Sequence, residues 1–418
     1  MAGAARGKVI PARKFGSGEM KMPEAIFSQT VSGNYIEDKS NIEDRDMLLV
    51  PDESTLRPVP WAMEPAASVF FDCYRKGGKP VETSPRRVLQ NVLQLYRDSG
   101  WTPVVAPEVE FYLIGAHSDA NEEVGPPKGR LGRTEWSKQP YSVDAMNDFD
   151  PFINDLYAFC DDQGIRIDTL SQEMGPAQFE INFLHGDAIE LADQVFLFKR
   201  TVREAAIKHR MHATFLARPT SGDPGSALHV HQSIVDANGR NIFADDDGAH
   251  SSLFMSYIGG LQKYMPEAQL IFAPYPNSYR RFLSYDSSPV NLEWATDNRT
   301  VGLRVPDSSP EARRVENRIA GSDVNPYLAI AATLACGYLG MKEGVEVRPA
   351  IEGSAYDLPF SLHRELHAAI SAFKSSAAMR QTLGESFVKL YSALKENEYL
   401  EFQEIVTPWE REVLMFNV

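Results

Sequence analysis

Residues 298–327 read NRTVGLRVPDSSPEARRVENRIAGSDVNPY, and we interpret the rest of the chain around this stretch. It predicts two short strands joined by a Pro-Asp-Ser-Ser-Pro turn, then a helix that starts near Asn325. Its five arginines are Arg299, Arg304, Arg313, Arg314 and Arg318. Because alternate strand residues point to one face, Arg314, Glu316 and Arg318 are expected to share a face.

These guanidinium groups need anionic partners, and the stretch itself holds few carboxylates. Arginine binds phosphate and carboxylate groups in a planar, bidentate manner. Two interpretations are open from this stretch alone. It is either a solvated, charged surface ribbon or one wall of an anion-binding site.

The composition is that of a globular protein. The 418 residues, 43% of them hydrophobic, predict one large or two ordinary domains with a sizeable core. The net charge of −15 disfavours a nucleic-acid partner, which would select a basic surface. The three cysteines are far apart, which indicates a reducing compartment. We see no signal peptide, and the longest apolar run, residues 327–339, is too short to span a bilayer. We therefore expect a cytoplasmic protein without a membrane partner.

The first 80 residues are strand-like and rich in turns, with good strand candidates at 47–52 and 67–74. An amphipathic helix then starts at Ser84-Pro85 and stops at Gly100. We place the domain boundary just before it, which gives an N-terminal domain of residues 1–82 and a second, larger domain of residues 83–418.

Several later strands have one apolar face and one face restricted to glutamate, histidine and arginine. The residues on that second face are Glu108, Glu110, Glu180, His229, His231, Glu316 and Arg318. A merely solvated face would also carry Lys, Thr, Ser and Gln. For each residue alone, a surface or structural role is the alternative. Together, such glutamates would repel one another unless cations neutralised them, and this donor set suits Mg²⁺ or Mn²⁺. Two metals that face an arginine wall indicate phosphoryl-transfer chemistry.

Six motifs between residues 100 and 340 identify a family. They are PEVEFYL (107–113), QEMGPAQFEINF (172–183), PGSALHVHQS (224–233), NSYRRF (277–282), NRTVGLRVP (298–306) and ARRVENRIAGSDVNPYLAIAATLACG (312–337). By these motifs the chain resembles the type I glutamine synthetase superfamily, and within it the γ-glutamylpolyamine synthetase-like branch. The resemblance implies an α+β fold, with an N-terminal β-grasp domain and a catalytic domain whose curved antiparallel sheet is flanked by helices. It also implies a double-ring oligomer, a dodecamer, with active sites shared between neighbouring subunits.

The resemblance assigns roles to individual positions. The ligands of one metal would be Glu110, Glu173 and Glu180. The ligands of a second metal, beside the ATP phosphates, would be Glu108, His229 and Glu316. The glutamate site would comprise Gly225, Arg281 and Arg318. The phosphates and the phosphoryl transition state would be held by Arg299, Arg304 and Arg314, and the nucleotide side by Asp168, His231 and Ser233.

The implied reaction is an ATP-dependent ligation. Phosphorylation of the γ-carboxylate of glutamate turns a poor leaving group into phosphate, and metals and arginines neutralise the transferred group. An amine then attacks γ-glutamyl phosphate to form a γ-glutamyl amide.

Three departures from the family pattern bear on the amine and on the N-terminus. Ser287 and Ser28 occupy the places of two acids that surround ammonium in relatives, with Asp286 as a possible catalytic substitute. Their loss favours a larger amine, a polyamine or diamine. The chain starts so close to Arg6-Gly7-Lys8 that we expect the first β-grasp strand to be missing. Finally, residues 175–177 read Gly-Pro-Ala where many relatives have Ala-Pro-Gly.

Three other functions stay open at this point. The chain could be a glutamine synthetase that uses ammonia, or a γ-glutamyl-monoamide synthetase. It could also be a catalytically silent regulator, although a sensor has no need of six intact metal ligands.

Overall fold

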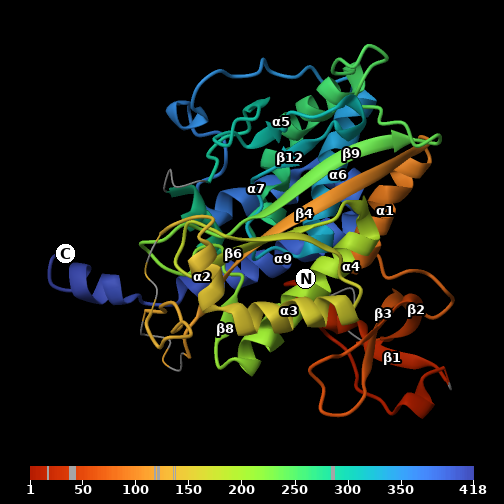
Figure 1. Ribbon diagram of the computed structural model, residues 1–418. Helices are drawn as coiled ribbons and strands as arrows, with labels where there is room; N and C mark the ends of the chain where they lie inside the picture. Colours follow the sequence, from red (N-terminus) through yellow and green to blue (C-terminus); the bar gives the residue numbers. More distant parts are fainter. Residues whose placement is uncertain are drawn as a thin grey trace.

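The computed structural model describes residues 1–16, 18–36, 44–116, 119, 123–134, 136, 138–283 and 288–418. Its first part is a small three-stranded antiparallel sheet in the order β1-β2-β3. Its strands are β1 (Met20–Pro23), β2 (Asp46–Pro58) and β3 (Ala67–Tyr74). In Figure 1 this sheet lies at one end of the molecule, apart from the larger sheet.

The larger sheet has the order β10-β11-β12-β9-β4-β6-β5, and β7 and β8 also pair with β4. Its strands are β4 (Trp101–Ile114), β5 (Ile167–Gln172), β6 (Gln178–Phe183), β7 (Gly186–Asp187), β8 (His212–Thr214), β9 (Leu228–Asp236), β10 (Trp294–Thr296), β11 (Leu303–Val305) and β12 (Val315–Asn317). Neighbouring strands are antiparallel except β10 and β11, which are parallel. Figure 1 shows β4 and β9 side by side across the middle, with α6 behind them.

The α-helices of the described residues are α1 (Pro85–Arg97), α2 (Val143–Asp148), α3 (Asp150–Asp162), α4 (Ala188–Lys208), α5 (Ser252–Phe272), α6 (Pro326–Glu343), α7 (Leu366–Ser375), α8 (Ala377–Leu383) and α9 (Glu385–Gln403). Short 3₁₀ turns include η2 (Glu24–Ser28), η3 (Pro276–Leu283) and η4 (Pro310–Ala312). The chain ends in a short helix, η6 (Glu410–Leu414), which projects from the body of the molecule (Figure 1). None of the helices in these described ranges combines the length and apolar character that a bilayer crossing requires.

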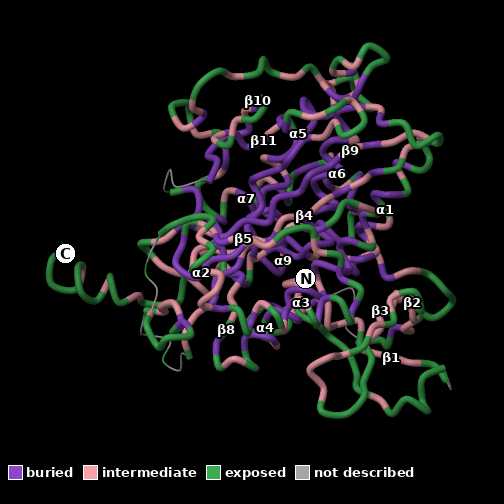
Figure 2. Tube along the Cα trace, viewed as in Figure 1, coloured by how far each residue is buried: buried purple, intermediate pink, exposed green. Residues whose placement is uncertain are grey.

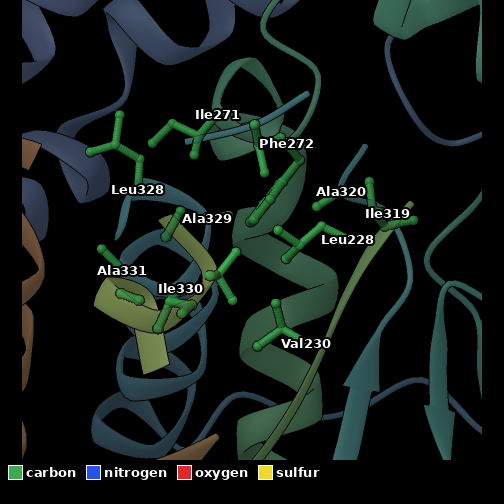
Figure 3. Packing of buried hydrophobic residues seen from close by; sticks show 14 of the residues in the cluster. Leu228, Val230, Ile271, Phe272, Ile319, Ala320, Leu328, Ala329, Ile330 and Ala331 are labelled. Atoms are coloured by element: carbon green, nitrogen blue, oxygen red, sulfur yellow. The ribbon is translucent and has the colours of Figure 1, made fainter. Parts of the chain in front are cut away.

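Alternation along the central strands separates an apolar core from a polar face. In β4 the core face carries Val105, Val109, Phe111 and Leu113, all buried. Figure 3 shows Leu228 and Val230 of β9 packed among residues of α5 and α6. Figure 2 shows the resulting block of buried chain in the middle of the molecule. Burial of so much apolar surface is the main stabilising term of the fold, and it fixes which face of each strand is left for polar residues.

Most predicted elements are confirmed at close to their predicted bounds. The strand at 67–74 is β3, and the helix that starts at Ser84-Pro85 is α1. Asn325 caps α6, because its Oδ1 accepts from the backbone N of Tyr327 at 3.1 Å. The segment ATFLARP at 213–219 also predicts a strand by its apolar and β-branched residues, but this prediction was wrong in extent, since β8 ends at Thr214. The division into residues 1–82 and 83–418 stays a prediction.

Candidate active site

The sheet registers bring four predicted residues together. Glu108 of β4 lies directly opposite His229 of β9, and Glu316 of β12 lies opposite His231. Oε2 of Glu108 is 3.2 Å from Nδ1 of His229, and its Oε1 is 2.9 Å from Nε2 of His231. Nδ1 of His229 is also 3.5 Å from Oε1 of Glu316. Residues separated by more than 200 positions thus form one cluster.

The same cluster contains two of the predicted arginines. Arg304 of β11 lies opposite Glu316 and donates to its Oε2 at 3.0 Å. Arg318 donates to Oε1 of Glu316 at 2.5 Å. The second guanidinium nitrogen of Arg304 donates to Asp297 at 3.0 Å. Glu316 is therefore held by two cations, although it is only 1% exposed.

The remaining glutamates lie next to this cluster. Glu110 and Glu180 are directly opposite each other on β4 and β6. Glu173 follows β5, and its backbone N donates to the carbonyl of Gln178 at 2.8 Å. Ligand atoms of Glu108, Glu180 and His229 lie within 4.8 Å of one another, as do those of Glu108, His231 and Glu316. Among the described residues, Glu108 thus belongs to both of these groups. The second group contains His231, so His231 could also bind a metal, although the sequence analysis proposed only His229 for that role.

The pKa values of the site carboxyl groups shift in opposite directions on the two sides of the site. Burial raises the pKa of Glu110 to about 8, with a further contribution from the nearby Glu173. Burial and the Glu108 and Glu110 carboxylates raise the pKa of Glu180 to about 10. The opposite holds for Glu316, because Arg318 and the histidines outweigh its burial and lower its pKa to about 2. Hydrogen bonds from His229 and His231 likewise outweigh burial at Glu108 and hold its pKa well below the usual range.

These residues fit a divalent cation. Burial and neighbouring carboxylates raise the pKa values of Glu110 and Glu180, so a positive charge placed between these groups would stabilise their ionised forms. Carboxylate oxygens with an imidazole nitrogen suit Mg²⁺ or Mn²⁺, and no cysteine is part of the set. The arginines favour a polyanion beside that cation.

Two of the predicted glutamate-binding residues, Gly225 and Arg281, lie against each other. A Cβ at this position would lie 2.5 Å from Cγ of Arg281 and 2.7 Å from the carbonyl O of Ala217, so only glycine fits. Arg281 is buried and donates to the carbonyl of Ile319 at 2.9 Å. Its buried Nε has no hydrogen-bond partner among the described residues, and this leaves a donor for an anionic ligand.

We expect Gly225→Ala to raise the KM for glutamate by about 10- to 100-fold, because the new methyl group must displace the Arg281 side chain. The KM for ATP is expected to change little. Steady-state kinetics with each substrate varied in turn measure both. Gly222→Ala is the matched control, since a Cβ there meets nothing within 4 Å. Equal effects of the two substitutions on glutamate would contradict this role for Gly225.

Other predicted residues lie outside the cluster. Arg299 is exposed, and Arg314 is half-buried and donates to the carbonyl of Ala312 at 3.1 Å. Among the described residues neither has a hydrogen bond to Glu316, whereas Arg304 does. Asp168 is exposed on β5, and Ser233 is half-buried on β9. Asp286 and Ser287 lie outside the described residues.

Two polar residues that the sequence analysis missed belong to the site. Nδ2 of Asn182 donates to Oε1 of Glu108 at 3.1 Å, and Nε2 of Gln178 lies 3.3 Å from Oε2 of Glu110. Both lie two positions from Glu180, so strand alternation could have placed them on the site face.

The structure also accounts for the Gly-Pro-Ala departure at 175–177. A Cβ on Gly175 would lie 2.0 Å from the hydroxyl of Tyr112, so glycine is required there. Ala177 takes the left-handed conformation with φ 54°, which glycine adopts more readily. Tyr112 therefore explains the glycine at 175, and the turn carries a strained alanine at 177.

Comparisons with known proteins agree with this geometry. Residues 82–414 match the family model described as glutamine synthetase, catalytic domain. The chain is 35% identical to gamma-glutamylputrescine synthetase PuuA of Escherichia coli (strain K12), over 99% of this chain and 90% of that protein. It is 34% identical to a glutamate–isopropylamine ligase of Pseudomonas sp, over 87% of this chain and 80% of that protein.

A solved structure has the same fold. The structure of GmaS without ligand matches with a TM-score of 0.85 and 25% identity, over 99% of this chain and 94% of that chain. A GmaS–ADP complex matches with a TM-score of 0.83 and 26% identity.

Proposed function

The chain belongs to the glutamine synthetase family, and we propose that it is an ATP-dependent ligase that joins the γ-carboxyl group of glutamate to an amine. The observation that carries this proposal is the arrangement around Glu316. One buried carboxylate contacts two guanidinium groups and approaches His229, next to a second group of glutamates whose pKa values are raised. Such a site holds cations and a polyanion together, as phosphoryl transfer requires.

We assign the metal-holding role to Glu108, Glu110, Glu173, Glu180, His229 and Glu316, with His231 as a further candidate. Bound divalent cations, Mg²⁺ or Mn²⁺ and two per site, would neutralise charge on the phosphates of ATP. Arg304 would stabilise the transferred phosphoryl group. Its terminal nitrogens bond to Glu316 and Asp297, and its buried Nε has no hydrogen-bond partner among the described residues, which leaves a donor for an anionic group. Arg299, Arg314, Asp168 and Ser233 stay proposals for nucleotide contacts.

The chemistry proceeds in two steps. An oxygen of the glutamate γ-carboxylate attacks the γ-phosphorus of ATP, and ADP leaves. The amine nitrogen then attacks the carbonyl carbon of γ-glutamyl phosphate and gives up a proton, and phosphate leaves. Arg281 and Arg318 would orient the glutamate carboxylates by bidentate pairing, which lysine could not reproduce.

The proposed amine is a diamine or polyamine. The named relatives include a γ-glutamylputrescine synthetase and a glutamate–isopropylamine ligase, and serines replace the two acids expected around ammonium. Asp286 and Glu293 are the acids nearest to Ser287 along the chain, and we consider both as partners for a distal ammonium group. Glu293 already bonds to Arg348 at 3.1 Å. Asp286, for which a catalytic role is also proposed, is the remaining candidate.

We expect putrescine or a longer polyamine to exceed ammonia in kcat/KM by about 5- to 150-fold, the equivalent of about 1–3 kcal/mol from one charged hydrogen bond. Glutamate-dependent ADP release over ammonia, isopropylamine, putrescine, cadaverine, spermidine and spermine tests this. Ser287→Glu should shift the preference toward ammonia. A panel led by ammonia would instead identify a glutamine synthetase, and one led by a monoamine a γ-glutamyl-monoamide synthetase.

We also propose that the active site is completed in a ring oligomer, a dodecamer. The Ser28 turn follows β1, and just after it the backbone N of Val31 donates to Oε1 of Glu398 in α9 at 2.7 Å. Among the described residues no hydrogen bond or ion pair joins this turn to the Glu316 cluster, which favours a role for it at the site of another copy. The projecting C-terminal segment exposes Trp409, Met415 and Phe416, and apolar side chains of this kind are typical of subunit contacts.

A further inference from the structure

Gln178 is the first residue of β6, and its side chain is 1% exposed. Its Nε2 lies 3.0 Å from the carbonyl O of Gly225, 3.3 Å from Oε2 of Glu110 and 3.3 Å from Oγ of Ser226. Its Oε1 accepts a hydrogen bond of 2.9 Å from the backbone N of Gly175. One buried carboxamide therefore joins β4, the loop before β9 and the turn between β5 and β6.

The contact with Glu110 selects which carboxylate oxygen faces the site. Oε2 of Glu110 receives the Gln178 amide and also the backbone N of Ala227 at 2.8 Å. Within the described ranges, no hydrogen bond involves Oε1 of Glu110. A carboxylate with one oxygen fixed by two donors presents the other oxygen in a single direction, which is how ligand carboxylates are commonly oriented.

The other contacts of Gln178 reach the glutamate side of the site. Its amide holds the carbonyl of Gly225, the glycine that makes room for Arg281. The backbone carbonyl of Gln178 accepts a hydrogen bond from the backbone N of Glu173 at 2.8 Å. The side-chain Oε1 of Gln178 accepts from the backbone N of Gly175, in the turn that follows Glu173. Gln178 is thus bonded to segments that carry a proposed metal ligand and a proposed glutamate-binding residue.

We propose that Gln178 is a positioning residue that couples the orientation of the Glu110 carboxylate to the shape of the glutamate-binding loop at Gly225. This inference rests on the proposed ligase function and names a residue that acts through others. It predicts that loss of the amide weakens cation binding and glutamate binding together, while ATP binding is largely retained.

The test uses the full chain with Gln178→Met and, as matched control, Gln172→Met. Gln172 is also 1% exposed, and its amide lies 3.5 Å from the carbonyl of Gly175 in the same turn. It pairs with the buried Phe179 in the sheet, and among the described residues its side chain has no hydrogen bond to Glu110 or Gly225. Titration calorimetry with Mn²⁺ alone is expected to show about 10- to 100-fold weaker binding for Gln178→Met and unchanged binding for Gln172→Met. The KM for glutamate should rise about 10-fold, against less than about threefold for ATP.

Gln178→Glu keeps the side-chain shape and the acceptor for Gly175, but it replaces the donor with an oxygen that faces the Gly225 carbonyl. Gln178→Glu should also raise the KM for glutamate by about 10-fold. This second variant keeps the test usable if Gln178→Met does not fold. The proposal is overturned if the Gln178 variants match Gln172→Met in Mn²⁺ affinity and glutamate KM. Because the Mn²⁺ titration needs no turnover, a failed ligase assay and a failed positioning role give different results.

Discussion

Glu316→Gln is expected to lower ligase turnover by about 10²- to 10³-fold, which is typical for loss of one electrostatic group aimed at a phosphoryl or acyl transition state. Glu316 is the acceptor for both Arg304 and Arg318, and it approaches His229. A neutral amide offers one oxygen in place of two charged ones. One guanidinium group then loses its acceptor, and the proposed cation loses a ligand.

Glutamine is preferred to alanine for a structural reason. Arg318 is 6% exposed, and removal of its buried partner would leave an uncompensated charge at a cost of about 3–5 kcal/mol in unfolding free energy. An alanine variant would therefore combine a folding defect with a catalytic one. Burst-phase measurement of ADP formation, with the melting temperature as the folding check, separates the two.

Glu311→Gln is the control, because Glu311 is an exposed residue of the preceding turn η4. It should retain turnover within about twofold. Near-normal turnover of Glu316→Gln at ordinary Mg²⁺ concentrations would remove Glu316 from the proposed metal set.

Removal of divalent cations with EDTA is expected to abolish turnover and to lower the melting temperature by several degrees, more at pH 8.5 than at pH 6.5. The pH dependence follows from the raised pKa values of Glu110, about 8, and Glu180, about 10. In the unfolded chain both groups ionise near pH 4.5. The native state therefore binds more protons than the unfolded state above that pH.

The contribution of these two groups to the free energy of unfolding is fully present below about pH 4.5. It is lost as the pH rises through about 8 for Glu110 and about 10 for Glu180. Glu316 and Glu108 have lowered pKa values and act in the opposite sense, but only in acid, so they add no slope between pH 6 and 9. A cation that binds the ionised carboxylates restores the lost stability, by about 2.7 kcal/mol at 100 times its Kd.

Thermal melts with EDTA or with Mg²⁺, taken between pH 6 and 9, measure this effect. Glu180→Gln is the informative variant, because it removes the group with the higher pKa and should flatten the dependence. A Mg²⁺-induced shift that is constant or declines with rising pH would contradict the proposed cation role of these carboxylates.

The sequence alone determined the local elements and the list of candidates. Alternation in β4 and β9 put Glu108 and Glu110, and His229 and His231, on the polar face, and burial of the opposite face confirms it. The helix start at Asn325 also followed from local chemistry alone. Local periodicity suffices here because it depends only on neighbours along the chain.

Only the tertiary structure decided which candidates meet. Strand register places Arg304 directly opposite Glu316. It also brings His231, which the resemblance assigned to the nucleotide side, into contact with Glu108. The role of Gln178 likewise depends on a loop more than 40 residues away. Register between distant strands is set by packing of the whole core, so no short segment of the sequence contains it.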